Sequence, residues 1–130
     1  MPALLAVVLL AVSPCKIVGA TDASATLGGP VGKPKAQTLG LYQSCTYSHG
    51  TATLTVQTRA VSRADFVKSA KANPKPIVPE PSLGVPAYYV ANFILLVWKN
   101  GTEATFSIAG ASGSPLAAET ALAKKALAKL

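Results

Sequence analysis

The chain of 130 residues has few of the side chains that most catalytic and metal-binding sites require. It contains one histidine, two cysteines and five acidic residues. A metal site or a Ser-His-Asp arrangement needs several such groups to converge, and no spacing brings a partner to His49. The acidic residues fall on different predicted elements, so no pair of catalytic carboxylates is indicated. We therefore predict a non-enzymatic protein with no catalytic site, no metal and no cofactor.

Negative charge is also scarce, because twelve Lys and Arg residues stand against five Asp and Glu residues and give a net charge of +7. The basic residues are scattered, with no Arg-rich run and no interleaved aromatic residues. Nucleic-acid-binding proteins usually concentrate both features in one surface. We expect no specific nucleic-acid partner and interpret the charge as favouring solubility, with a weak general attraction to anions.

Long apolar runs are missing except at the start of the chain. Residues 1–13 are apolar and end in small residues, which is the pattern of an export signal. This segment is short and carries no Lys or Arg, so its true start lies upstream or it forms a strand or helix of the domain. Residues 88–98 are apolar but too short to span a membrane. We predict an export signal over residues 1–13 and one secreted, periplasmic or cell-envelope domain over residues 14–130.

The two cysteines, Cys15 and Cys45, are predicted to form a disulfide, because an exported chain meets an oxidising environment. In the chain-entropy model, closing a loop of about thirty residues contributes roughly 3.5 kcal/mol. A lipid anchor on Cys15 is the alternative, since small residues precede it. Pro14 disfavours that alternative because it restricts the peptide that a signal peptidase must bind. Peripheral membrane association is expected only for the lipidated form.

The first half of the chain is predicted to form a short helix, a loop and a hairpin. Residues 21–28 form a helix that a glycine ends, and residues 31–40 form the loop. Residues 41–47 and 51–59 form two antiparallel strands, because the second alternates apolar residues with threonines and Gln57, which are expected on the outer face. His49 falls in the turn between these strands, where we expect a solvated side chain.

The middle of the chain is predicted to form a helix followed by an irregular segment. Ser62 and Asp65 have the spacing of a capping box, and the helix that they begin ends before Asn73. Residues 75–81 contain too many prolines for a helix or a strand ladder, so we predict a surface excursion.

Three strands and a helix are predicted for the remainder. The strands lie at residues 87–91, 93–99 and 102–108, and the third alternates so that Ala104, Phe106 and Ile108 are expected to face inward. Ser114 is expected to cap the helix. The second strand is almost continuously apolar, which indicates burial on both faces, and the sequence Asn-Gly after it indicates a type I′ turn. The helix is expected to bury one apolar stripe, made of Leu116, Thr120, Ala123, Leu127 and Leu130. Its Glu119 is expected near the positive end of the helix dipole.

These elements predict the α+β class, with an antiparallel sheet of about five strands covered by helices. The predicted order is α-β-β-α-β-β-β-α. Tyr88 and Tyr89 are adjacent on a strand, so one should enter the core and the other should face outward. With Trp98 on a neighbouring strand, they form our candidate aromatic binding patch, and ordinary sheet packing is the alternative.

Several short motifs occur together in an order typical of one group of proteins. The motifs are Pro14-Cys15, Leu27-Gly28, Cys45-Thr46-Tyr47, residues 83–89, Lys99-Asn100-Gly101 and residues 117–130. The chain resembles a family of small secreted or lipid-anchored proteins, common in actinobacteria, that carry a domain of unknown function. The resemblance implies a disulfide between Cys15 and Cys45 and an antiparallel sheet covered by helices. Two features depart from the family: the lipobox and linker before Pro14 are missing, and Pro86 replaces an acidic residue.

Our leading hypothesis is an exported binding protein of the bacterial cell envelope that uses its sheet and the loop at residues 74–86. One alternative is a carrier that holds a lipid-like ligand in a pocket between sheet and helix. Another alternative is a secreted enzyme inhibitor that inserts the 74–86 loop as a wedge.

Overall fold

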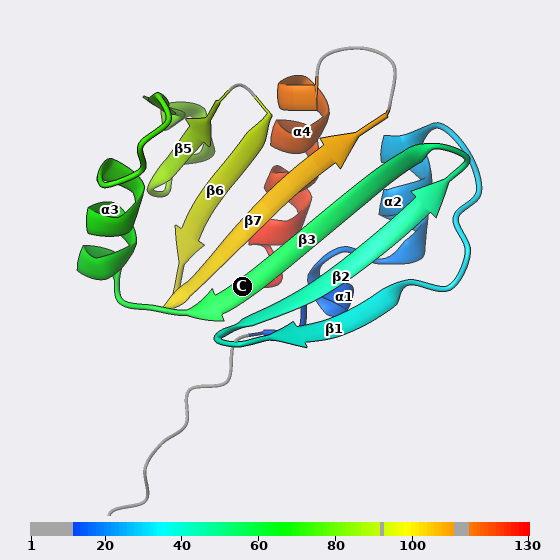
Figure 1. Ribbon diagram of the computed structural model, residues 1–130, viewed down its shortest axis with the longest axis horizontal. Coiled ribbons are helices and arrows are strands. Elements are labelled where there is room, and N and C mark those ends of the chain that lie inside the picture. The colour runs from blue at the N-terminus through cyan, green and yellow to red at the C-terminus, as the bar shows by residue number, and fades with distance from the viewer. Residues whose placement is uncertain (1–11, 92, 111–114) are drawn as a thin grey trace, which may run out of the picture.

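A seven-stranded antiparallel sheet forms the centre of the fold (Figure 1). The computed structural model describes residues 12–91, 93–110 and 115–130, so most of the predicted export segment and the expected cap Ser114 lie outside the described residues. The strands are β1 (Lys35–Leu39), β2 (Tyr42–His49), β3 (Ala52–Ala60), β4 (Ile77–Pro79), β5 (Ala87–Val90), β6 (Ile94–Lys99) and β7 (Thr102–Ala109). Their spatial order is β1-β2-β3-β7-β6-β5-β4.

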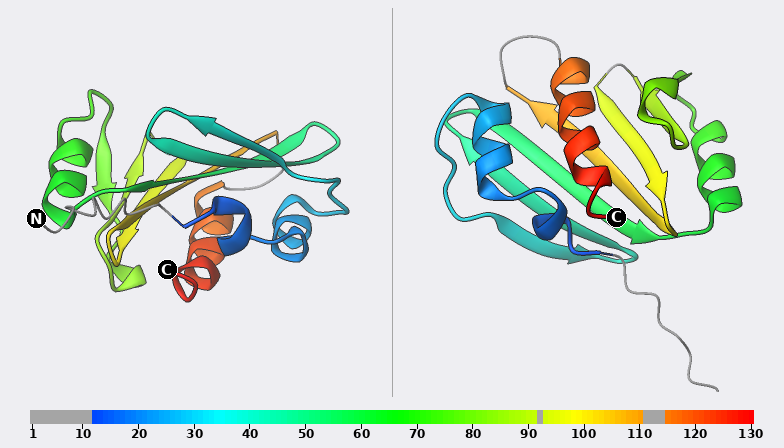
Figure 2. Two further views of the ribbon diagram at one scale, coloured as in Figure 1. Left: turned by 90° about the horizontal axis from the view of Figure 1, so that it is seen from below. Right: turned by 180° about the vertical axis from the view of Figure 1, so that it is seen from behind.

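Within the described ranges, four α-helices and one 3₁₀ helix accompany the sheet. They are α1 (Pro14–Ile17), α2 (Ala20–Leu27), α3 (Arg63–Lys71), the 3₁₀ helix η1 (Pro81–Leu83) and α4 (Pro115–Leu127). Helices α1, α2 and α4 cover one face, and α3 stands on the other side of the sheet near β6 (Figure 2). The α+β class is therefore confirmed, and the part of the chain that the structure describes leaves most of the second face uncovered.

Local turns determine most of the strand pairing. Asn100 and Gly101 join β6 to β7 with φ angles of 50° and 81°, and this left-handed pair is what a type I′ turn requires. The predicted hairpin of β2 and β3 is also present, and it pairs Gln43 with Thr58 through to His49 with Ala52. The pairing of β3 with β7 is different, because it joins segments more than forty residues apart in the chain and fuses two meanders into one sheet.

The core lies between the sheet and the helices α1, α2 and α4. Alternate residues of the central strands point into it, including Val56 of β3, Leu95 of β6 and Phe106 of β7, all without solvent exposure. The prediction that Ala104, Phe106 and Ile108 face inward is confirmed. Burial of such side chains supplies the main favourable free energy of folding.

The prediction of about five strands is wrong, because the sheet has an additional strand at each edge. β1 lies in the predicted loop at residues 31–40, and β4 lies in the predicted excursion at residues 75–81. All five residues of β1 are exposed, so the strand carries no alternation of apolar and polar side chains. β4 ends in Pro79, which an edge strand tolerates since its N–H is not needed for the ladder. The predicted element order is corrected accordingly.

Two predictions about side-chain burial are also corrected. β6 is buried on one face only, since Leu95 and Val97 enter the core whereas its alternate residues stay half-buried on the open face. In α4 the buried residues are Glu119, Leu122, Ala123, Ala126 and Leu127. The stripe therefore differs from the predicted one, because the carboxyl of Glu119 is drawn inward to the backbone N–H of Ile108.

A disulfide joins Cys15 of α1 to Cys45 of β2, as predicted, with their Cα atoms 5.4 Å apart. Hydrogen bonds fix the same segment to the sheet, since Tyr47 Oη donates to the carbonyl of Val18 and Thr58 Oγ1 to that of Val12. A disulfide is compatible with an extracellular location. Within the described ranges, no helix combines the length and apolar character that crossing a membrane would need.

Candidate binding site

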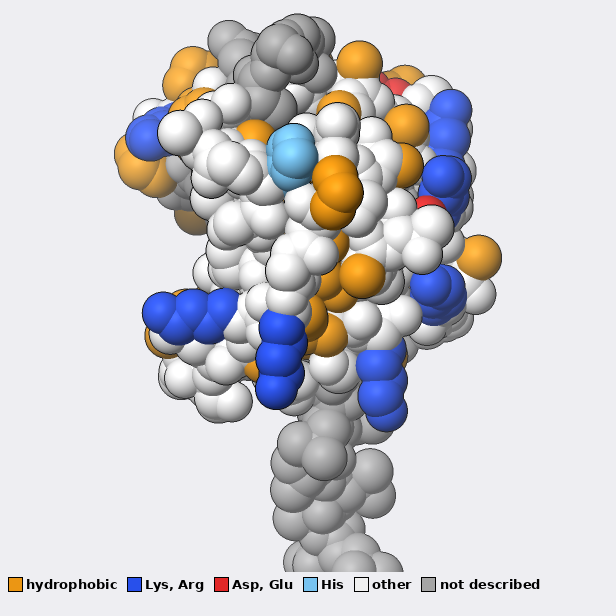
Figure 3. All heavy atoms as spheres, turned by 90° about the vertical axis from the view of Figure 1, so that its right-hand side faces the viewer, with side chains coloured by type: hydrophobic (Ala, Val, Ile, Leu, Met, Phe, Trp, Pro, Cys, Tyr) orange, Lys and Arg blue, Asp and Glu red, His pale blue; other side chains and the backbone are white. Residues whose placement is uncertain are grey.

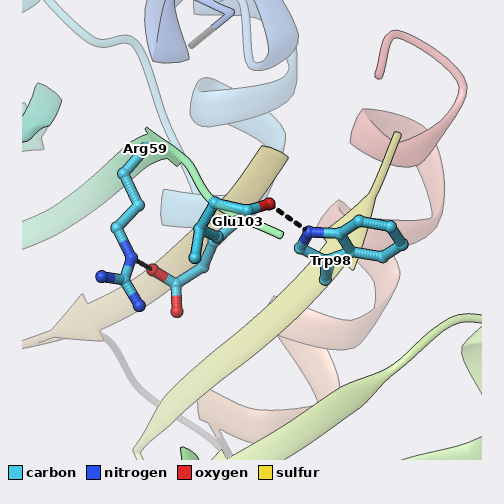
Figure 4. A network of polar contacts seen from close by, with 4 residues as sticks. Arg59, Trp98 and Glu103 are labelled. Carbon is cyan, nitrogen blue, oxygen red and sulfur yellow. Dashed lines mark hydrogen bonds and ion pairs between the residues drawn. The ribbon is translucent and has the colours of Figure 1, made fainter. Parts of the chain in front are cut away.

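The open face of the sheet carries a row of large polar and aromatic side chains that crosses four strands. Glu103 of β7 lies directly opposite Arg59 of β3 and, on its other side, opposite Trp98 of β6. Tyr42 of β2 continues the row, and the Arg59 guanidinium carbon lies 5.3 Å from the centre of its ring. Figure 4 shows the Arg59–Glu103 ion pair with Trp98 on the adjacent strand. Strand register therefore places these four side chains side by side.

Arg59 and Glu103 form a largely buried ion pair at the centre of this row. Arg59 Nε donates to Glu103 Oε2 at 2.5 Å, and the two side chains are 17% and 6% exposed. Burial raises the pKa of the Tyr42 hydroxyl, and the negative charge of Glu103 raises it further. The charges of the pair therefore act on the neighbouring Tyr42 hydroxyl, where Arg59 opposes the effect of Glu103.

Several hydrogen-bonding groups of the ion pair are not used within it. Among the described residues, neither the two Nη groups of Arg59 nor Oε1 of Glu103 makes a hydrogen bond. Across all the residues that the structure describes, Glu119 Oε1 is the one fully buried side-chain polar atom without a hydrogen-bond partner. The unused groups of Arg59 and Glu103 consequently remain in contact with solvent, where a ligand can reach them.

A pocket of about 220 Å³ opens above this ion pair. Its residues come from five strands and from α3 and the turn that follows it. They are Tyr42, Gln57, Arg59, Ser69, Ala70, Asn73, Val90, Ile94, Leu96, Glu103 and Thr105. Polar side chains of β3 and β7 form one part of the floor, apolar side chains of β6 form another, and α3 forms a wall.

A cap fixes the first turn of α3, and two contacts hold the helix against the sheet as the wall of the pocket. The Ser62 hydroxyl accepts a hydrogen bond from the N–H of Asp65 at 3.1 Å, which confirms the predicted cap. Trp98 Nε1 donates to the carbonyl of Val61, just before the helix, at 2.8 Å. Phe66 of α3 packs against Tyr88 of β5, with ring centres 6.0 Å apart. Two residues of our predicted aromatic patch thus support the helix.

The structure divides the predicted patch of Tyr88, Tyr89 and Trp98 between the two faces of the sheet. Tyr88 and Trp98 share the open face, where both are partly buried under the start of α3. Tyr89 lies on the helical face, and its hydroxyl is hydrogen-bonded to Thr120 of α4. The three rings therefore cannot form one exposed surface, because adjacent residues of a strand point to opposite faces.

The histidine is not the freely solvated turn residue that we expected. His49 Nδ1 lies 2.8 Å from the carbonyl oxygen of Pro30, and its ring packs over Gly29. This contact ties the loop after α2 to the turn between β2 and β3. Over the described ranges, no three His, Cys, Asp or Glu side chains come together as a metal site would require.

The 74–86 loop is attached to the fold. Its β4 segment pairs with β5, and its η1 segment contacts α4. Ser82 donates hydrogen bonds to the Glu80 carboxylate, and the side-chain bond lowers the pKa of that carboxyl. This bracing leaves less of the loop free to insert into an enzyme than the inhibitor hypothesis assumed.

On the side of the molecule shown in Figure 3, the Lys and Arg side chains project at several places around the margin and do not form one continuous patch. On the helical side, Lys125 of α4 pairs with Asp22 of α2 at 3.6 Å. This arrangement agrees with the scattered positions of these residues in the sequence.

Most of the pocket residues were not predicted from the sequence, including Tyr42, Arg59, Glu103 and Asn73. One signal was available, since the polar alternation of β3 assigned Gln57 to the outer face. No local pattern could pair β3 with β7, however, and only that pairing brings Arg59 to Glu103.

Comparison with known proteins returned no matching family model, no matching curated protein and no matching solved structure. The resemblance to the actinobacterial family therefore stays a prediction.

Proposed function

We propose that this protein is an exported, non-enzymatic binding protein of the bacterial cell envelope, and that its ligand docks in the pocket on the open sheet face. The apolar opening segment and the disulfide support export. The uncovered sheet face and its pocket support binding, because concave sites with a few convergent polar groups are where small ligands bind.

The observation that carries this proposal is the Arg59–Glu103 pair, which presents free donors and a free acceptor next to each other. Glu103 balances the charge of Arg59, so the pocket favours a neutral ligand over an ion. A hydroxyl group both donates and accepts, and it is therefore the group that such a pair satisfies best.

We infer that the ligand is a neutral carbohydrate unit of an envelope glycan. Gln57, Asn73 and Thr105 add amide and hydroxyl groups around the ion pair, and they can bond to further sugar hydroxyls. Ile94 and Leu96 supply an apolar patch on the floor, against which the C–H face of a sugar ring can pack. The pocket thus offers polar groups for the hydroxyls of a sugar and apolar side chains for its C–H face.

The test is binding of the disulfide-bonded protein to an array of hexose, pentose and N-acetylhexosamine oligosaccharides, with affinities then measured by calorimetry. We expect Gln57→Ala and Thr105→Val each to weaken binding about tenfold, as the loss of one hydrogen bond to a ligand can. Thr53→Val is the matched control, because Thr53 lies on the same face of β3 but outside the pocket.

Two results would overturn the proposal. One is the absence of binding to every oligosaccharide on the array by the folded protein. The other is equal affinity of the wild type and the two pocket variants, since that would place the ligand elsewhere. Short neutral peptides serve as competitors, and binding of peptide without glycan would contradict the carbohydrate assignment.

A further inference from the structure

The two edges of the sheet differ in how well they are protected against further strand pairing. At one edge β4 has only three residues, ends in Pro79 and follows Pro76. Proline lacks the N–H that a new strand would need, so this edge is blunted. At the other edge β1 has five exposed residues and no proline (Figure 1). The unprotected edge is therefore the one that β1 forms.

The backbone groups that β1 presents outward follow from its turn. Leu39 and Tyr42 close a two-residue turn with Gly40, at φ +62°, in its first position. The closing residues of such a turn form a hydrogen-bonded pair, and hydrogen bonding then alternates along the ladder. The N–H and C=O groups of Ala36 and Thr38 consequently point away from β2, toward the open edge.

These outward groups are self-complementary. If a second β1 strand runs antiparallel with Gln37 facing the same residue of the second copy, Ala36 faces Thr38 in both directions. Every outward N–H then meets an outward C=O. In this register the two Lys35 side chains lie at opposite ends, roughly 14 Å apart along the strands, which exceeds the screening length at physiological salt. A parallel arrangement would instead place the two lysines side by side.

Exposed apolar side chains occur at the same edge. Leu39 is 50% exposed and Leu41, in the turn, is 83% exposed. In the antiparallel register Leu39 lies opposite Lys35 of the second copy, whose methylene groups can cover it. The pairing therefore buries apolar surface as well as satisfying backbone groups.

We propose that two copies of this chain associate through β1, antiparallel and centred on Gln37, to form one continuous sheet. The open faces of both copies then lie on the same side, because a two-fold axis along the normal to the sheet relates them. This association is independent of the ligand proposed for the pocket. It uses one short strand, so the dimer should be a weak one that forms with rising protein concentration.

The first test places a single cysteine on β1 in the otherwise native protein. Gln37→Cys should give a covalent dimer under mild oxidation, because the two substituted residues face each other. Lys35→Cys is the matched control, since it is equally exposed but faces Leu39 of the second copy. Peptide mapping verifies that Cys15 and Cys45 stay paired. Equal cross-linking of both variants, or none with Gln37→Cys, would overturn the proposal.

The second test is sedimentation equilibrium over a wide range of protein concentration. Thr38→Pro removes an outward N–H but leaves the ladder to β2 intact, and it should weaken dimerisation about tenfold or more. Thr38→Val keeps that N–H and should dimerise as the wild type does. A wild type that is monomeric at every concentration, or a dimer indifferent to Thr38→Pro, contradicts the inference.

Discussion

Glu119 of α4 accepts a hydrogen bond from the backbone N–H of Ile108 on β7, with 3.2 Å between Glu119 Oε2 and the nitrogen. The side chain of Glu119 has no solvent exposure. Burial raises the pKa of this carboxyl to about 8, although the bond from Ile108 acts in the opposite direction. An acidic residue thus ties the C-terminal helix to the end of a central strand.

The first prediction concerns the pH dependence of stability. The pKa of Glu119 is about 8 in the folded state and near its ordinary value of about 4.5 in the unfolded state. Between these values the folded protein binds the extra proton, so its contribution to stability is complete at low pH and is lost as pH rises. The slope should approach about 1.4 kcal/mol per pH unit in this window. Urea unfolding at a series of pH values measures it.

Glu119→Gln is the matched variant for this measurement, because it keeps the shape and an acceptor but cannot ionise. Its free energy of unfolding should vary less between pH 5 and 8, and it should exceed that of the wild type at the upper end. Parallel pH profiles for the two proteins would show that Glu119 does not control this dependence.

The second prediction concerns the disulfide between Cys15 and Cys45, which are separated by 30 residues. Replacing both cysteines with alanine should lower the free energy of unfolding by about 3 kcal/mol, because the unfolded chain regains the freedom that the closed loop removes. Denaturant unfolding with and without a reductant provides the check. The double variant should not respond to the reductant, and a wild type equally indifferent to it would contradict the prediction.

The third prediction separates the Arg59–Glu103 interaction from the burial of each charge. Glu103→Ala leaves a guanidinium largely buried without its partner, so the loss of stability should be about 2–3 kcal/mol. The double variant Arg59→Met, Glu103→Leu should be much closer to the wild type, since no charge is left unpaired. A double-mutant cycle of the wild type, Arg59→Met, Glu103→Leu and the double variant, measured by urea unfolding, isolates the interaction; additive losses would mean that the two side chains do not interact.

The fourth prediction concerns the contact between His49 and Gly29. A Cβ atom at Gly29 would lie 2.3 Å from His49 Cε1, so Gly29→Ala must displace the imidazole from the carbonyl of Pro30. We expect a loss of about 1 kcal/mol, in the range of one hydrogen bond. The loss should largely disappear in a His49→Ala background. Gly32→Ala is the control from the same loop, because a Cβ atom at Gly32 would meet nothing within 4 Å and should not destabilise the fold.

Local sequence patterns predicted the elements whose signals involve neighbouring residues. The Asn100-Gly101 turn, the cap at Ser62 and the alternation of β3 and β7 were all identified correctly. The disulfide was also predicted correctly, because an export segment together with two cysteines favours their pairing over a lipid anchor on Cys15. Each of these features depends on residue types a few positions apart or on composition alone.

Local sequence patterns could not predict the edge strands or the candidate site. β1 and β4 form because a neighbouring strand offers them unpaired backbone groups, and their own side chains carry no periodic signal. Glu119 likewise points inward because its carboxylate accepts a hydrogen bond from the N–H of Ile108. That N–H has no partner in β6, since the pairing of β6 with β7 ends at Ser107.

The sequence by itself determined the fold class, the disulfide, the turn between β6 and β7 and the inward faces of the central strands. Tertiary structure alone decided which strands that are distant in the chain lie side by side. Pairing β3 with β7 placed Arg59 beside Glu103, and the packing of the helices decided that Tyr89, not Tyr88, lies on the face that α4 covers. The physical reason is that backbone hydrogen bonds between strands are the same for any residue type, so distant pairing depends on how the whole sheet buries its core.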